Sequence, residues 1–267
     1  MKKYLSFFRL RFSMGLQYRA AALAGVVTQF AWGFMEIMVF RAFYRADPGA
    51  FPMSFSATAS YVWLQQALLA LFAPWLMEQE IFSSIVNGNV VYELCRPLSI
   101  YNMWFSRSAA TRLSKAVLRC FPILVVAAFL PSPYGIVPPA SRRHFILFLA
   151  ALILGLAMTV SFCVLIYILA FFTISPQGLQ MIFITLTDFF SGGIIPLPFF
   201  PEKMRQFMEL LPFAATQNVP LRIYSGSMTV PEIQKAIFLQ LFCLATVTAI
   251  GKLLCLAAQK RVTVQGG

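Results

Sequence analysis

The stretch from Phe145 to Ile174, FILFLAALILGLAMTVSFCVLIYILAFFTI, carries no charged residue over its whole length. A helix needs about 20 mostly apolar residues to cross the hydrocarbon core of a bilayer, where its backbone hydrogen bonds must all be satisfied within the segment. The stretch is long enough for such a crossing. It predicts a membrane-spanning helix, the fourth of a series along the chain.

Five further stretches qualify or nearly qualify as spans. They run from Ala20 to Phe40, Ala59 to Met77, Ala116 to Leu130, Leu179 to Phe200 and Ala236 to Ala258. The stretch that begins at Ala116 is the weakest because it contains Arg119 and Pro122, although an arginine near a helix end can extend to the headgroups. The sequence therefore predicts an all-α, polytopic membrane protein with six transmembrane helices, forming a single permease-like domain over residues 1–267.

The composition fits a chain that meets lipid over much of its surface. Hydrophobic residues make up 60% of the 267 and charged residues 11%, against about half and about a quarter in soluble domains. The net charge of +12 comes from lysines and arginines that stand between the apolar stretches, where they face anionic headgroups. We predict the lipid bilayer as a partner, and no nucleic acid.

Orientation follows from the positions of the 21 Lys and Arg residues. With the N-terminus inside, thirteen of them fall on the cytoplasmic side and eight outside, in agreement with the positive-inside rule. The sequence predicts a multi-pass protein of the cell membrane, a bacterial plasma membrane, with both termini in the cytoplasm.

Residues 1–19 mix apolar with basic side chains ahead of the first span. Arg9 and Arg11 interrupt the apolar run and no small-residue cleavage site follows, so the segment is not a cleavable signal peptide. The composition favours a helix lying in the cytoplasmic interface, with its cations toward lipid phosphates. A frayed basic tail is the alternative.

The cytoplasmic stretch 78–115 between the second and third spans is long enough to have a task of its own. It begins with a short amphipathic pattern that contains Ile81, Phe82 and Ile85, then the turn signal Asn87-Gly88-Asn89. A second short run with Tyr92 and Glu93 ends at Arg96-Pro97. We predict a helix that docks into a groove on a partner; the alternative is a helix that lies on the membrane.

The segment 191–212 follows the fifth span. Gly192, Gly193, Pro196 and Pro201 interrupt a hydrophobic run near the outer surface, and irregular backbone at that depth is tolerated only against protein or a wet cavity. We predict an outer re-entrant turn. An amphipathic helix from Glu202 to Leu211 should lie on the outer interface, and Thr229 with Glu232 should form a capping box for the sixth helix, which has Pro231 in its first turn.

These two segments resemble the type-2 ATP-binding-cassette permease superfamily, in its branch of short six-span permeases. The first match is Ile85-Val86-Asn87-Gly88 followed by Tyr92-Glu93-Leu94-Cys95-Arg96-Pro97-Leu98. The second runs from Phe190-Ser191-Gly192 through Pro196 and Pro201 to Leu211-Pro212-Phe213, then Pro220 and Gly226. In topology the resemblance covers nearly the whole chain; in motif it covers these two stretches.

The resemblance implies a half-transporter that exports its substrate with the help of other chains. A second permease, identical or related, and two cytoplasmic ABC ATPase subunits would complete it. No G-x-x-x-x-G-K-[ST] motif occurs in the chain, so it forms no P-loop, and ATP and Mg²⁺ would be bound by the partner ATPase rather than by any cofactor site here. The residues implied in ATPase coupling are Ile81, Phe82, Ile85, Gly88, Tyr92, Glu93, Arg96 and Pro97.

Polar side chains inside the predicted spans are candidates for a substrate pathway, because burying them in a membrane is costly. They are Gln29, Glu36, Gln65 and Asp188. In one interpretation the two acids line a cavity and attract a cationic or amphipathic substrate. In the other they pair with Arg41 or Arg119, or bond neighbouring helices, without touching a ligand.

Three other functions compete with an ATP-driven permease. An ion-coupled secondary transporter would use Asp188 and Glu36, but it should show broken helices in two repeated halves. A lipid-modifying enzyme needs clustered acids or a nucleophile with its base, and dispersed acids with one histidine supply neither a catalytic group nor a metal site. A structural subunit remains an alternative.

Overall fold

The computed structural model describes residues 2–47, 49 and 51–260, and every regular element in these ranges is a helix. In chain order the helices are α1 (Lys2–Gly15), α2 (Arg19–Ala46), α3 (Phe55–Ala67), α4 (Leu69–Phe72), α5 (Gln79–Val86), α6 (Val90–Leu94), α7 (Ile100–Phe129), α8 (Arg142–Leu169), the 3-10 turn η1 (Ala170–Phe172), α9 (Pro176–Phe190), the 3-10 turn η2 (Leu197–Phe199), α10 (Glu202–Leu210), α11 (Asn218–Tyr224) and α12 (Val230–Gln259). The all-α prediction is confirmed.

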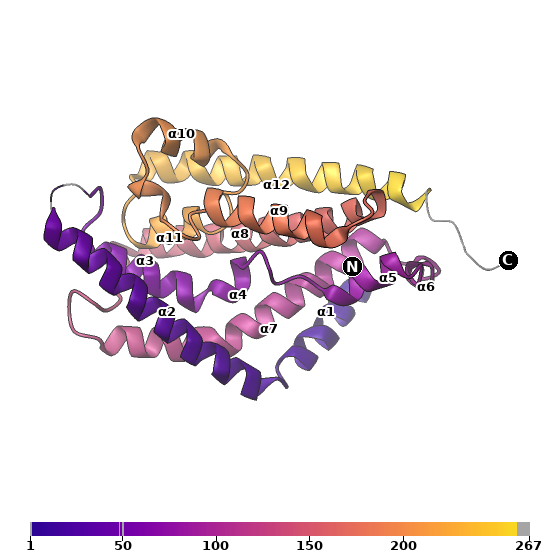
Figure 1. Cartoon of the computed structure of the whole chain (residues 1–267), viewed down its shortest axis with the longest axis horizontal. Coiled ribbons are helices and arrows are strands. Elements are labelled where there is room, and N and C mark those ends of the chain that lie inside the picture. Colours follow the sequence, from indigo (N-terminus) through magenta and orange to yellow (C-terminus); the bar gives the residue numbers. More distant parts are fainter. Residues whose placement is uncertain (1, 48, 50, 261–267) are drawn as a thin grey trace.

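Three of these helices are long and apolar enough to cross a membrane. They are α2, α8 with η1, and α12. The charge-free stretch of sequence forms α8, which packs against α7, α11 and α12 and contributes most of its second half to the core. Figure 1 shows α8 and α12 running side by side along the length of the molecule.

The predicted second span is a broken helix. Helix α3 ends at Ala67, Leu68 has non-helical backbone angles, and α4 ends at Phe72, well before Met77. One cause is local: Ala73 precedes Pro74, and the residue before a proline is driven out of the helical region. Residues 73–78 therefore continue as an irregular segment, in which Ala73, Pro74 and Met77 stay buried.

Two other predicted boundaries also shift. Helix α7 begins at Ile100, so residues 100–115, predicted as part of a cytoplasmic stretch, continue the third apolar segment as one helix. Helix α9 ends at Phe190, and Gly192 adopts a positive φ of 76° immediately afterwards. Only glycine populates that region at little cost, so the fifth predicted span stops about ten residues before Phe200.

The local signals at helix ends are confirmed. Thr229 and Glu232 form the capping box, with Pro231 in the first turn of α12. Gly88 follows α5 with a φ of 74°, and the amphipathic pattern after Pro201 is helix α10.

The short helices gather at opposite ends of the molecule. Figure 1 shows α10 and α11 near one end, and α5 and α6 at the other, near the C-terminal end of α12. Helix α1 has no buried residue but packs along α7, where the backbone N–H of Ser99 donates to the Tyr4 hydroxyl at 2.9 Å. The predicted N-terminal helix therefore exists and is attached to the bundle.

At Gly155, α8 packs directly against the backbone of another part of the chain. A Cβ at this position would lie 2.3 Å from the backbone oxygen of Thr216. Because backbone cannot rotate away, we expect Gly155→Ala to lower the free energy of unfolding by about 1–3 kcal/mol. Thermal unfolding in detergent measures the loss.

Gly178→Ala in α9 is the matched control, since its Cβ would meet the nearest atom at an ordinary 3.6 Å. Alanine also favours the helix over glycine by up to about 1 kcal/mol. Equal unfolding temperatures for the two variants would contradict the close contact at Gly155.

Candidate functional site

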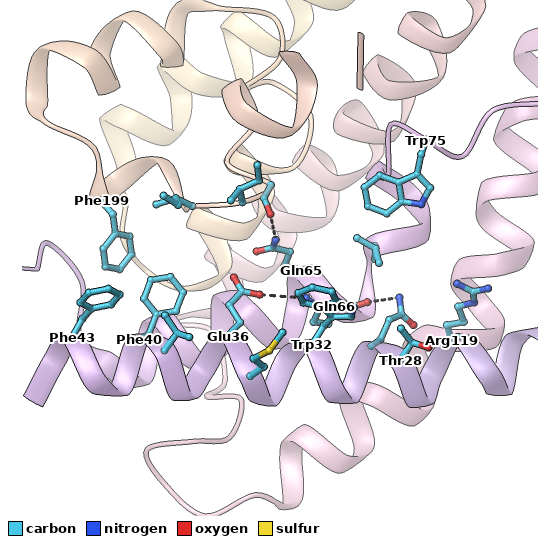
Figure 2. A pocket seen from close by; sticks show the side chains of 18 of the residues that line it. Thr28, Trp32, Glu36, Phe40, Phe43, Gln65, Gln66, Trp75, Arg119 and Phe199 are labelled. Atoms are coloured by element: carbon cyan, nitrogen blue, oxygen red, sulfur yellow. Dashed lines mark hydrogen bonds between the residues drawn. The ribbon is translucent and has the colours of Figure 1, made fainter. Parts of the chain in front are cut away.

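A cleft of about 980 Å³ lies between α2, the broken helix α3–α4 and the segment after α9. Three of the four predicted pathway residues line it: Gln29, Glu36 and Gln65. Figure 2 shows the polar side chains in the middle of the cleft, with Phe40, Phe43 and Phe199 at one end and Arg119 at the other. Three residues that the sequence analysis selected one by one therefore lie around one cavity.

The spacing on α2 explains why its polar residues share a face. Gln29 and Glu36 are seven residues apart, close to two helical turns, so they project to the same side about 10 Å apart along the axis. Gly33 lies between them and lets α2 approach α3: a Cβ there would stand 3.0 Å from the Trp63 ring. This close packing brings Gln65 and Gln66 of α3 to the same cavity.

Hydrogen bonds connect these polar side chains across the helices. Gln29 Nε2 donates to the backbone oxygen of Gln66 at 2.9 Å, and Gln66 Nε2 donates to Glu36 Oε2 at 3.4 Å. Gln65 Nε2 donates to the backbone oxygen of Gly193 at 2.7 Å. The network fixes both the separation of α2 from α3 and the position of the segment after α9.

The predicted pairing of the intramembrane acids with Arg41 or Arg119 is wrong for the described part of the chain. The ion pairs there join neither Glu36 nor Asp188 to an arginine. The Arg41 guanidinium lies 5.3 Å from the centre of the Tyr134 ring. The Arg119 guanidinium lies beside Gly25 of α2, about one helical turn from Gln29 and about three turns from Glu36. Glu36 instead accepts a hydrogen bond from Gln66 of α3, which is the contact with a neighbouring helix that the same interpretation named.

Asp188, the fourth predicted pathway residue, lines an adjoining cavity of about 180 Å³. The two cavities share Gln65, Leu69, Trp75, Gly193 and Ile194. Asp188 thus lines the adjoining cavity beyond Gln65, and it does not line the cleft that contains Glu36.

The segment after α9 closes this side of the cleft. Gly192 and Pro196 are buried, Gly193 is half-buried and Pro201 is exposed. A Cβ at Gly192 would lie 3.4 Å from the Tyr61 hydroxyl of α3, and Gln217 Nε2 donates to Ser191 Oγ at 3.2 Å. The irregular backbone is therefore held against protein, as predicted for a break at this position.

The predicted coupling residues divide into an inner and an outer set. Ile81 and Phe82 are buried and Ile85 is half-buried, so this face of α5 packs on the bundle. Gly88, Tyr92, Arg96 and Pro97 are exposed, and Tyr92 exposes 74% of its surface. Glu93 accepts a 2.6 Å hydrogen bond from Trp104 Nε1 of α7. Only the outer set is available for contact with another chain.

Sequence reasoning missed the residues that hold this segment to the bundle. Arg107 of α7 pairs with Glu78 at 3.0 Å and also with Glu80, while the backbone N–H of Glu78 donates to the Tyr167 hydroxyl of α8 at 2.8 Å. The chain has nine acidic residues, and two of them, Glu78 and Glu80, stand at the start of α5. This concentration of acids was the available signal. Sequence alone does not indicate that these acids pair with a side chain of α7.

Arg112 is the second missed residue. It is 1% exposed, and its guanidinium donates to the backbone oxygens of Leu71, Ala73 and Leu76 and to Cys163 Sγ, at 2.7–3.1 Å. Arg107 and Arg112 were counted among the headgroup-facing cations, as was Arg222, which is buried and paired with Glu209. The prediction that these three arginines face lipid headgroups is therefore wrong, because they are buried. Arg261, for which the same was predicted, lies outside the described residues.

Comparison with known proteins gives one positive finding. The model of a family described as "ABC-2 family transporter protein" matches residues 30–266. The curated proteins contain no match. The matched range takes in the cleft-lining parts of α3 to α9, the segment that carries α5 and α6, and α12.

Proposed function

Because the chain belongs to the ABC-2 transporter family, we propose that it is the membrane-spanning permease subunit of an ATP-driven exporter. Cytoplasmic ABC ATPases in separate chains would bind ATP and Mg²⁺, and a second permease, identical or related, would complete the transporter. The substrate would move by alternating access through the cleft beside α2.

Six crossings of the cell membrane with both termini in the cytoplasm are the proposed topology. Helices α2, α8 and α12 supply three of them. The broken helix α3–α4, helix α7 and helix α9 supply the others, supported by their packing against α2 and α8. The end of the molecule that carries α5 and α6 would face the cytoplasm, and the end with α10 would face outward.

The observation that carries this proposal is the direct attachment of the α5–α6 segment to helices of the cleft. Arg107 and Arg112 belong to α7 and bind both sides of the α4–α5 connection, as described above. Helix α7 itself packs on α2, α3 and α4. A partner that pushes on the exposed Tyr92 face would therefore move the wall of the cleft through a short chain of buried contacts.

Affinity purification of the tagged chain in mild detergent from its native host, with mass spectrometry of the co-purifying proteins, tests the partners. We expect an ABC ATPase at near-equal stoichiometry. A stable protein that repeatedly purifies without an ATPase would contradict the proposal and favour an ion-coupled transporter. The presence or absence of a second permease sequence in the same preparation distinguishes a heterodimer from a homodimer.

A further inference from the structure

The cleft holds three buried oxygen atoms that accept no hydrogen bond from the described part of the chain. They are Gln29 Oε1, Glu36 Oε1 and Gln65 Oε1. Gln29 and Gln65 are only 3% and 4% exposed, and all three residues line the same cavity. Buried acceptors are normally satisfied, so a cluster of free ones facing a cavity points to donors supplied by a ligand.

The orientation of the two amides is fixed by their neighbours. Oxygen and nitrogen of a glutamine are hard to distinguish by shape, and their assignment follows from hydrogen-bond partners. Here the –NH₂ groups of Gln29 and Gln65 each face a backbone carbonyl oxygen, which only accepts. The atom left free must therefore be the acceptor oxygen in both cases.

Each amide –NH₂ of this network already donates one hydrogen bond within the chain. Gln66 Nε2 donates to Glu36 Oε2, which leaves Oε1 of the same carboxylate free. The polar middle of the cleft thus offers acceptors together with one acidic group. The Arg119 guanidinium also lines the cleft. It lies beside Gly25 of α2, about one turn from Gln29 and eleven residues from Glu36, which is roughly 16 Å along the helix.

The remainder of the lining is apolar and largely aromatic. Trp32, Phe40, Phe43, Trp75 and Phe199 face the cavity (Figure 2), and aromatic faces attract cations as well as apolar rings. A volume of about 980 Å³ lies within the range of sites for drug-sized ligands. The cavity therefore fits a bulky apolar body attached to a small polar group.

We propose that the cleft selects amphiphiles that carry a protonated amine with free N–H groups. The ammonium group donates to Glu36 Oε1, and further N–H or O–H groups of the ligand donate to Gln65 Oε1 and Gln29 Oε1. The apolar body lies among the aromatic side chains. This names the substrate class of the proposed exporter and rests on that function.

A set of three fluorescent probes tests the selection on the unmodified chain. Each probe is a dansyl group with a five-carbon chain that ends in a primary ammonium, a trimethylammonium or a carboxylate. Titrated into the purified full-length protein in lipid nanodiscs, with empty nanodiscs as the background, the primary ammonium should bind about tenfold more tightly than the trimethylammonium, because only it donates N–H bonds to charged and neutral acceptors. The carboxylate should bind most weakly.

Three results would overturn the proposal. Equal binding of the two cationic probes would mean that charge and apolar area alone decide. Tightest binding of the carboxylate would assign selection to Arg119. Absence of saturable binding by every probe would mean that lipid or a second copy of the chain covers the cleft.

Glu36→Gln locates the preference. It keeps the size of the side chain and an acceptor oxygen but removes the charge, so the roughly tenfold preference should fall below about threefold. Asp47→Asn is the matched control, because Asp47 is exposed at the end of the same helix, where its Oδ1 accepts from the Gly49 N–H. An unchanged preference in Glu36→Gln would reject Glu36 as the ammonium site, and the wild-type series stands even if that variant fails to fold.

The titration uses the chain without any ATPase, so its failure is separate from failure of the proposed function. An ATPase that co-purifies alongside a chain with no ammonium preference would reject the ligand class alone. A clear preference in a chain that never co-purifies with an ATPase would reject the energy source alone.

Discussion

Arg112→Met is expected to lower the free energy of unfolding by about 3 kcal/mol or more. Arg112 binds the backbone oxygens of Leu71, Ala73 and Leu76, where α4 ends and the chain leaves the bundle. Methionine has a similar length but no donor. Each buried acceptor left unsatisfied costs about 1–3 kcal/mol. The Leu71 and Leu76 oxygens would lose their partner, whereas Ala73 O still accepts from the Leu76 N–H at 3.2 Å.

The opposing effect is the release of a buried charge. Removing an isolated guanidinium from the interior relieves its desolvation penalty, and fully apolar replacements of buried ion networks are sometimes stabilising. That relief requires both sides of the interaction to become apolar. Here the acceptors are main-chain carbonyls that no side-chain change removes, so the loss should dominate.

Thermal unfolding of the purified protein in detergent gives the measurement, and Arg143→Met is the matched control at the exposed start of α8. Arg112→Lys should fall between the two, because one ammonium group cannot span three separated carbonyls as a planar guanidinium does. An unchanged unfolding temperature in Arg112→Met would show that residues 71–76 hold their conformation without the arginine.

Features set by neighbours in sequence were predictable. The amphipathic spacing of Met204, Phe207 and Met208 gave α10, and Thr229 with Glu232 gave the start of α12, because both signals act within one or two helical turns. The polar residues of the cleft were predictable for a related reason. Gln29 and Glu36 are conspicuous in an apolar helix, and helical spacing alone puts them on one face.

Features set by distant partners were not predictable. The early end of α4 depends in part on Arg112, about forty residues further along the chain. Arg107 looks in sequence like a cation for the headgroups, and only the fold places Glu78 beside it. Ile81 and Phe82 likewise fit an exposed docking face by pattern, but the attachment of Glu78 and Glu80 to α7 turns that face inward.

Gly88→Pro is expected to reduce ATP-driven transport by the reconstituted complex about tenfold or more, with the chain still folded. Gly88 has a φ of 74°, and proline is restricted to about −65°. The turn must change, and the hydrogen bond from the Gly88 N–H to the Ile85 oxygen at 3.2 Å is lost. The change redirects α6 and Tyr92, the part of the segment that is free to contact an ATPase.

Gly226→Pro is a control with the same backbone change at the opposite end of the molecule. Gly226 has a φ of 72°, its N–H donates to the Ile223 oxygen at 3.3 Å, and, as at Gly88, no atom lies within 4 Å of the position of a Cβ. Both variants should therefore lose similar stability, about 1–3 kcal/mol for a forced backbone change. Only Gly88→Pro should separate ATP hydrolysis from transport, because only its turn lies on the proposed ATPase face. An equal loss of transport in the two variants would mean that general destabilisation, rather than coupling through the α5–α6 segment, explains the effect.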